Sequence, residues 1–97
     1  MIARMFIEVI GNHQLPDHVD RDDVEDLLAT ALRADGEVTG AGGGSGRWHL
    51  DVEVSAGADQ VPHVLRRLAT ALVGQDLGWV VLRPGHEETG KSARDLA

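Results

Sequence analysis

Residues 47–55, RWHLDVEVS, alternate apolar and polar side chains without a break. The apolar side chains, which fall on one side of an extended chain, are Trp48, Leu50, Val52 and Val54. The polar side chains on the opposite side are His49, Asp51 and Glu53. Side chains of a strand point alternately to the two faces of its sheet, so this pattern predicts a β-strand with one face in the core. The polar face of that strand is the first surface to consider for function.

Three other segments are predicted to be strands. Residues 2–10 (IARMFIEVI) alternate as well, with Met5, Ile7 and Val9 on one side and Arg4, Phe6, Glu8 and Ile10 on the other. Residues 37–39 predict a short strand, and residues 78–83 (GWVVLR) predict the last strand. The glycine tract at residues 40–46 predicts a loop or an irregular hairpin tip, because glycine disfavours regular elements.

Two segments have the apolar spacing of amphipathic helices. In residues 20–34 the apolar stripe consists of Val24, Leu27, Leu28, Ala31 and Leu32. Acidic residues at the start of this segment suit an N-cap and the positive end of the helix dipole. Residues 59–73 repeat the pattern, and Pro62 is acceptable there because the first turn needs no N–H donor from it. Both segments are therefore predicted to pack an apolar face on the sheet.

The resulting order, β-α-β-β-α-β, predicts an α+β fold of the ferredoxin-like sandwich type. Four antiparallel strands in the order 4-1-3-2 would carry both helices on one face. Residues 1–85 would form this single domain, and the polar residues 86–97 are expected to be a frayed tail. The other sheet face would stay open, and its expected binding residues are Arg4, Phe6, Glu8, His49, Asp51 and Glu53, with Trp79 and Arg83 on an edge strand.

Composition excludes several classes of function. The chain has 97 residues, no cysteine, and 16 Asp and Glu against 9 Lys and Arg, for a formal net charge of −7. Without cysteine it has no disulfide, thiolate zinc site or cysteine nucleophile. The negative charge argues against nucleic acid as a partner. No apolar run approaches the roughly 20 residues of a membrane-spanning helix, so we expect a cytoplasmic protein.

Residues 36–46 (GEVTGAGGGSG) and the HLDVEV stretch that begins at His49 resemble a group of small uncharacterised bacterial proteins. In that group a helix ends, a short strand runs into a glycine-rich turn, and an acidic alternating strand follows. The resemblance implies a ferredoxin-like fold and a bacterial source, and it implies no particular activity. His49 departs from the more acidic strand of that group.

Two motifs suggest ligands, and each has a simpler structural explanation. The glycine tract lacks the following helix and the lysine of a phosphate-binding loop, so a flexible hairpin is the better interpretation. The first loop and the following helix start gather possible nitrogen and oxygen ligands, namely His13, Asp17, His18, Asp20, Asp22 and Asp23. Helix capping explains these acids without a metal, so we expect neither a metal nor a cofactor.

His49, Asp51 and Glu53 form the best candidate constellation. They lie in line on one strand face with roughly 6.5–7 Å between successive members. A carboxylate beside a histidine suits general base catalysis, but a flat sheet face supplies no enclosed pocket. RNA binding on this face is disfavoured because Glu8 and the two carboxylates of the strand would repel phosphate.

The sequence therefore predicts a non-catalytic binding or regulatory protein. Eight of the 16 acidic residues lie between residues 17 and 37, and those expected on the first helix are Asp20, Asp22, Asp23 and Asp26. Such charge favours an inhibitor of a basic protein, of the immunity-protein or antitoxin type. Apolar residues on the open face also favour a homodimer. The alternatives are a homodimeric small-molecule-binding protein or cofactor-free enzyme using the open sheet face, and a structural domain of a larger assembly.

Overall fold

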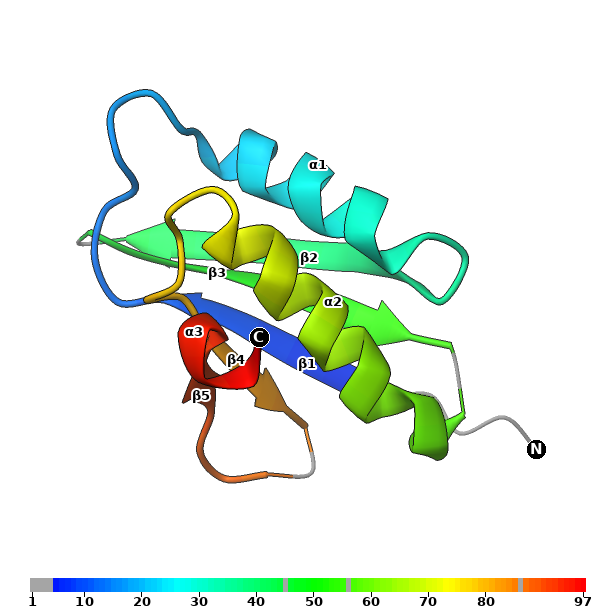
Figure 1. Ribbon diagram of the computed structural model, residues 1–97. Coiled ribbons are helices and arrows are strands. Elements are labelled where there is room, and N and C mark those ends of the chain that lie inside the picture. Colours follow the sequence, from blue (N-terminus) through cyan, green and yellow to red (C-terminus); the bar gives the residue numbers. More distant parts are fainter. Residues whose placement is uncertain (1–4, 45, 56, 86) are drawn as a thin grey trace.

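A five-stranded sheet carries two long helices on one of its faces (Figure 1). The computed structural model describes residues 5–44, 46–55, 57–85 and 87–97. In chain order the elements are β1 (Met5–Gly11), α1 (Arg21–Leu32), β2 (Gly36–Gly44), β3 (Arg47–Val54), a 3-10 turn (Ala58–Gln60), α2 (Val61–Val73), β4 (Val81–Pro84), β5 (Lys91–Ser92) and α3 (Ala93–Leu96).

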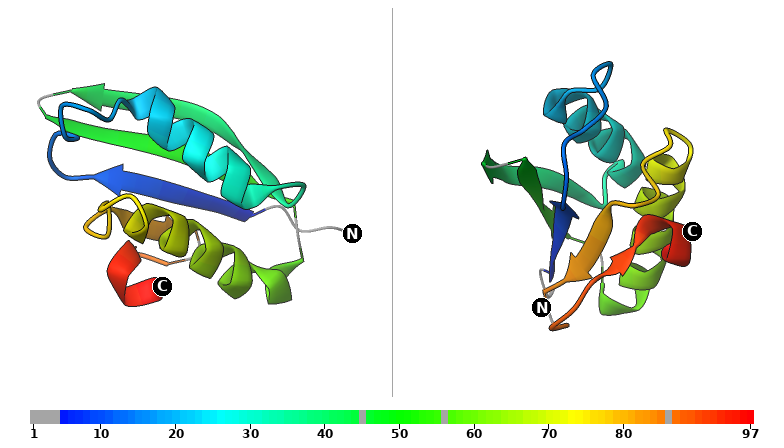
Figure 2. Two further views of the ribbon diagram at one scale, coloured as in Figure 1. Left: turned by 45° about the horizontal axis from the view of Figure 1, so that its top comes forward. Right: turned by 90° about the vertical axis from the view of Figure 1, so that its left-hand side faces the viewer.

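The predicted α+β class is confirmed, whereas the predicted number of strands is wrong. The strands lie in the order β2-β3-β1-β4-β5, and every neighbouring pair is antiparallel. The short β5 extends the sheet beyond β4 and makes five strands where four were expected. Figure 2 shows α1 and α2 side by side on one face of the sheet, while the opposite face carries no described helix. None of the helices in the described ranges is long and apolar enough to cross a bilayer.

The core lies between the sheet and the two helices. Register places Ile7 opposite Val52 and Val9 opposite Leu50, and all four side chains are buried. Each long helix presents a stripe of buried residues spaced by four, which are Val24, Leu28 and Leu32 in α1 and Val64, Leu68 and Leu72 in α2. This spacing keeps the side chains on one face of a helix, as the sequence pattern predicted.

Residues 40–44 of the glycine tract form a regular strand, so the prediction that they are a loop or an irregular hairpin tip is wrong; Gly46 lies in the turn that follows. β2 runs through Gly44 and pairs with β3 along its whole length, with a register shift between Val38 and Gly40. Two of the glycines lie under side chains of β3. A Cβ on Gly42 would lie 2.5 Å from Cε1 of His49, and a Cβ on Gly40 would lie 2.9 Å from Oδ2 of Asp51. Backbone pairing to β3 therefore holds this strand, and the glycines leave room for the two side chains above them.

The end of the chain also differs from the prediction. The last expected strand begins three residues later than predicted, at Val81, so Trp79 lies outside it. The expected frayed tail instead forms β5 and α3, and His86 lies outside the described residues. Ala93 is fully buried, and its N–H donates to the carbonyl of Val80 at 2.8 Å. The N–H of Arg94 donates to the carbonyl of Gly78 at 3.0 Å, so the segment from β5 onward belongs to the folded unit.

Candidate functional site

The open face of the sheet carries one exposed aromatic side chain beside carboxylates. Phe6 is 53% exposed, more than any other large apolar side chain in the described ranges. Strand register places it opposite Glu53 of β3, which in turn lies opposite Glu37 of β2. Directly paired residues of antiparallel strands share a face, so these three side chains form one row across the sheet. The sequence did not single out Glu37, because its pairing with Glu53 depends on the β2–β3 register.

The neighbouring row contains the predicted residues Asp51, Glu8 and Arg83. Glu8 lies opposite Asp51 on one side and opposite Arg83 on the other. Nη2 of Arg83 lies 2.9 Å from Oε2 of Glu8, which makes an ion pair across β1 and β4. Asp51 and His49 are half-buried above the glycines of β2. The open face thus brings together the predicted Phe6, Glu8, His49, Asp51, Glu53 and Arg83.

Trp79 does not belong to this face, and the predicted Arg4 lies outside the described residues. The indole of Trp79 stacks on His13 with ring centroids 3.8 Å apart and meets Trp48 edge to face at 6.3 Å. Nε1 of Trp48 donates to the carbonyl of His13 at 3.2 Å. Trp79 therefore packs against the core because its segment turns before β4 begins. Its role is structural, in closing the end of the sandwich.

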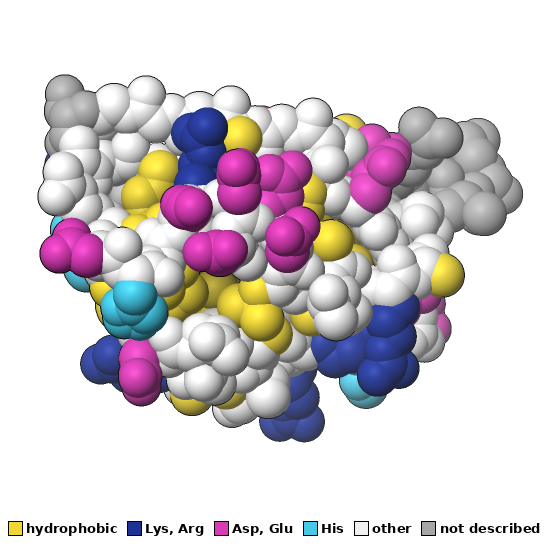
Figure 3. Space-filling model, turned by 90° about the horizontal axis from the view of Figure 1, so that it is seen from above, with side chains coloured by type: hydrophobic (Ala, Val, Ile, Leu, Met, Phe, Trp, Pro, Cys, Tyr) yellow, Lys and Arg dark blue, Asp and Glu magenta, His cyan; other side chains and the backbone are white. Residues whose placement is uncertain are grey.

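The acidic residues of the first helix lie where the sequence placed them. Asp20 is the N-cap of α1, and its N–H donates to Oδ2 of Asp23 at 3.0 Å. Asp22, Asp23 and Asp26 are exposed, and none of them forms an ion pair with a described cation. Figure 3 shows carboxylates gathered over α1. Exposed carboxylates are therefore concentrated in the first turns of α1.

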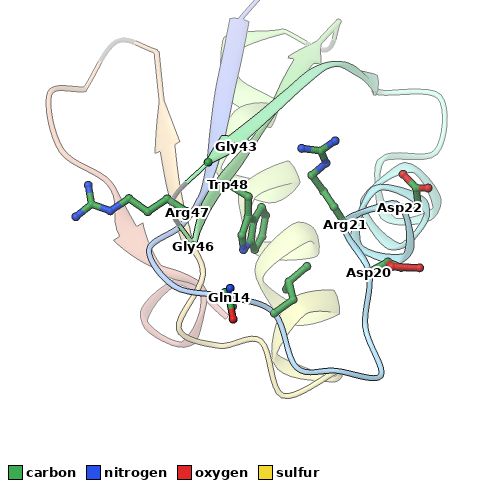
Figure 4. A pocket seen from close by; sticks show the side chains of 10 residues that line it. Gln14, Asp20, Arg21, Asp22, Gly43, Gly46, Arg47 and Trp48 are labelled. Carbon is green, nitrogen blue, oxygen red and sulfur yellow. The ribbon is translucent and has the colours of Figure 1, made fainter.

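A pocket of about 440 Å³ opens between the end of the β2–β3 hairpin and the start of α1 (Figure 4). Trp48 lies at its centre, Arg21 points toward the hairpin, and Asp20 and Asp22 point away. His49 and Asp51 do not line it. Within the described ranges, no three His, Asp or Glu side chains group closely enough to hold a metal ion. The pocket and the polar strand face are thus separate surfaces.

A second hollow runs along the helices and was not anticipated from the sequence. Two adjoining depressions of about 390 and 660 Å³ share Leu27 and Thr30 of α1. Asp23 and Asp26 line one end, whereas Arg33 and Arg66 line the other. The groove forms only where α2 packs beside α1, so the spacing within either helix alone does not reveal it. We call it the interhelical groove.

Neither the open sheet face nor the interhelical groove can be assigned by analogy. Comparison with known proteins found no matching family model, and no significant match among the curated proteins or the solved structures.

Proposed function

We propose that this protein is a non-catalytic binding protein that contacts a basic protein partner through its open sheet face. The observation that carries the proposal is the exposure of Phe6 among carboxylates of three strands. The carboxylates of this face in the described ranges are Glu8, Glu37, Asp51 and Glu53. The specific form that we favour is an inhibitor of the immunity-protein or antitoxin type.

An exposed aromatic side chain within a polar surround has the arrangement of a binding hot spot. Most of the affinity of a protein interface comes from a few buried anchors, and aromatic side chains are prominent among them. Phe6 suits an apolar pocket on the partner, and carboxylates around it favour Lys and Arg at the rim of that pocket. The acids of α1 extend the negative potential beyond the contact and would raise the association rate with a basic protein.

The finer fold assignment that we propose is a ferredoxin-like sandwich with a C-terminal extension. The strands β4, β1, β3 and β2 are neighbours in that order, and α1 and α2 lie on one face. In this view β5 and α3 are additions to the edge beyond β4. The extension pairs with β4 at the edge and leaves the face around Phe6 accessible, which supports a binding role for that face.

Capture of partners from the native cell tests the proposal, with Phe6→Ala and Val73→Ala compared with the unaltered chain. Val73 is the matched control because it is the other exposed large apolar side chain, at 41%, and it lies on α2. We expect the unaltered chain to capture a basic protein in stoichiometric amount and to release it at high salt. The Phe6→Ala variant should bind this protein at least about tenfold more weakly, whereas the Val73→Ala variant should still retain it. Absence of any stoichiometric basic protein, or equal loss with both variants, would contradict the proposal.

A further inference from the structure

The interhelical groove separates its charges by sign. α2 runs roughly antiparallel to α1, so the end of α1 lies beside the beginning of α2 (Figure 1). Asp23 and Asp26 therefore mark one end of the groove, and Arg33 and Arg66 mark the other. Figure 3 shows carboxylates gathered over α1 with apolar surface beside them, and basic side chains toward the lower right; single basic side chains also lie beside the carboxylates and at the lower left.

The charges at both ends are available to a partner. Arg67, which also lines the basic end, is already paired with Asp35 at 2.6 Å. Arg33 and Arg66 form no ion pair with any described carboxylate. Asp26 likewise forms no ion pair with a described cation. The groove thus offers two unpaired cations at one end and acidic side chains at the other.

We propose that the interhelical groove is the contact surface between two copies of this chain. A twofold axis that crosses the groove at its middle, perpendicular to its length, would place the Asp23 and Asp26 end of each copy against the Arg33 and Arg66 end of its partner. Such a contact is isologous, so a surface must be complementary to itself. Charges of opposite sign at the two ends meet that requirement. The proposed contact with a basic protein lies on the other face of the molecule and does not require this dimer, although Asp23 and Asp26 are also among the α1 acids that would steer that partner.

The charges of the open sheet face and of the interhelical groove favour different binding partners. The open sheet face carries four carboxylates, listed above, against Arg47 and Arg83 within the described ranges. Apposing two such faces brings like charges together, which disfavours self-association there. With Arg67 paired to Asp35, the described groove has two carboxylates, Asp23 and Asp26, and two guanidinium groups, Arg33 and Arg66, that form no described ion pair, so a second copy fits it. We therefore place the homodimer contact on the helices and leave the sheet to an unlike, basic partner.

The floor of the groove suits the packing of helix against helix. Its middle is lined by Leu27, Thr30, Ala31 and Ala71, three of which are small. Small side chains in the floor of the groove allow a helix of the second copy to pack closely between α1 and α2. Helices of 12 and 13 residues are about 18–20 Å long, so the contact falls at the low end of interface sizes. A concentration-dependent and salt-sensitive dimer is expected from such a contact.

Sedimentation equilibrium at low salt, with one charge reversed at either end, tests this arrangement. Asp26→Lys cancels the negative charge of the acidic end, where Asp23 remains, and Arg66→Glu cancels the positive charge of the basic end, where Arg33 remains. Both side chains are exposed, so the fold should persist, and far-ultraviolet circular dichroism checks that it does. We expect the unaltered chain to dimerise and each variant alone to dimerise at least about tenfold more weakly. An equimolar mixture of the two variants should form a heterodimer. At one contact the two reversed side chains then face each other with opposite sign, and at the other contact Asp23 and Asp26 of one copy face Arg33 and Arg66 of its partner.

Glu88→Lys supplies the matched control, since it makes the same charge change in the exposed turn between β4 and β5. It should leave dimerisation within about twofold of the unaltered chain. Three results would overturn the proposal: a monomer at every concentration, variants that dimerise as well as the unaltered chain, or a mixture that fails to associate. A dimer that Phe6→Ala disrupts and the groove variants do not would place the contact on the sheet and overturn it as well.

Discussion

Arg83 joins two strands and a turn through one guanidinium group. Its Nη2 lies 2.9 Å from Oε2 of Glu8 on the neighbouring β1, and its Nη1 donates to the carbonyl of Glu87 at 2.9 Å. Register places Glu8 and Arg83 directly opposite each other. The same side chain therefore fixes a charge of the open face and holds the turn that leads toward β5. A residue predicted to bind a partner also has a structural role.

Replacing this guanidinium should destabilise the protein measurably. Arg83→Met retains most of the side-chain volume but removes both contacts, so we expect the free energy of unfolding to fall by about 0.5–1.5 kcal/mol. The side chains of Arg83 and Glu8 are 30% and 37% exposed, which keeps the expected loss moderate. Urea denaturation measures it. Arg47→Met is the control, because Arg47 forms no ion pair with a described carboxylate, and an equal loss there would contradict the structural role.

The end of β1 offers a sharper test of packing. A Cβ added to Gly11 would fall inside van der Waals contact with the indole of Trp48, whereas a Cβ added to Gly44 of β2 meets nothing within 4 Å. Trp48 is almost fully buried, so its ring has little space into which to move. We expect Gly11→Ala to lower the free energy of unfolding by about 1–3 kcal/mol and to alter tryptophan fluorescence.

Gly44→Ala is the matched control and should change stability by less than about 0.5 kcal/mol. Thermal unfolding followed by fluorescence measures both variants under one set of conditions. If the two substitutions cost the same, the close approach of Gly11 to the Trp48 ring would be wrong.

Much of the fold follows from periodicity in the sequence. The alternation of residues 47–55 fixes which side of β3 enters the core, and the four-residue spacing in α1 and α2 fixes the buried helix faces. Periodicity predicts these faces well because each apolar side chain on a buried face adds to the stability of the fold. The open-face placement of Phe6, Glu8 and Asp51 follows directly from the same patterns.

What periodicity could not supply depended on contacts between distant segments. The glycines of β2 have no side chains and therefore show no alternation of apolar and polar residues. They form a strand because their backbone hydrogen-bonds to that of β3. Trp79 reads as a strand residue by composition, but Val80 donates its N–H to the carbonyl of Leu77 and the chain turns there. The opposed charges of the groove come from separate helices, so only their packing reveals them. Contacts between segments that are distant in the sequence cannot be predicted from the spacing of residues within one segment.

The C-terminal segment gives the clearest consequence of such a distant contact. Ala93 begins α3 with no exposed surface and hydrogen bonds to Val80, so its side chain has no room for a larger or charged group. Ala93→Asp places a carboxylate where the described residues provide no buried polar partner, and we expect the free energy of unfolding to fall by at least about 3 kcal/mol. Asp95→Ala, on the exposed side of the same helix, should change it by less than about 0.5 kcal/mol. Chemical denaturation measures the free energy of unfolding of both variants. If the C-terminal segment were a dispensable tail, the two substitutions would change this free energy equally little.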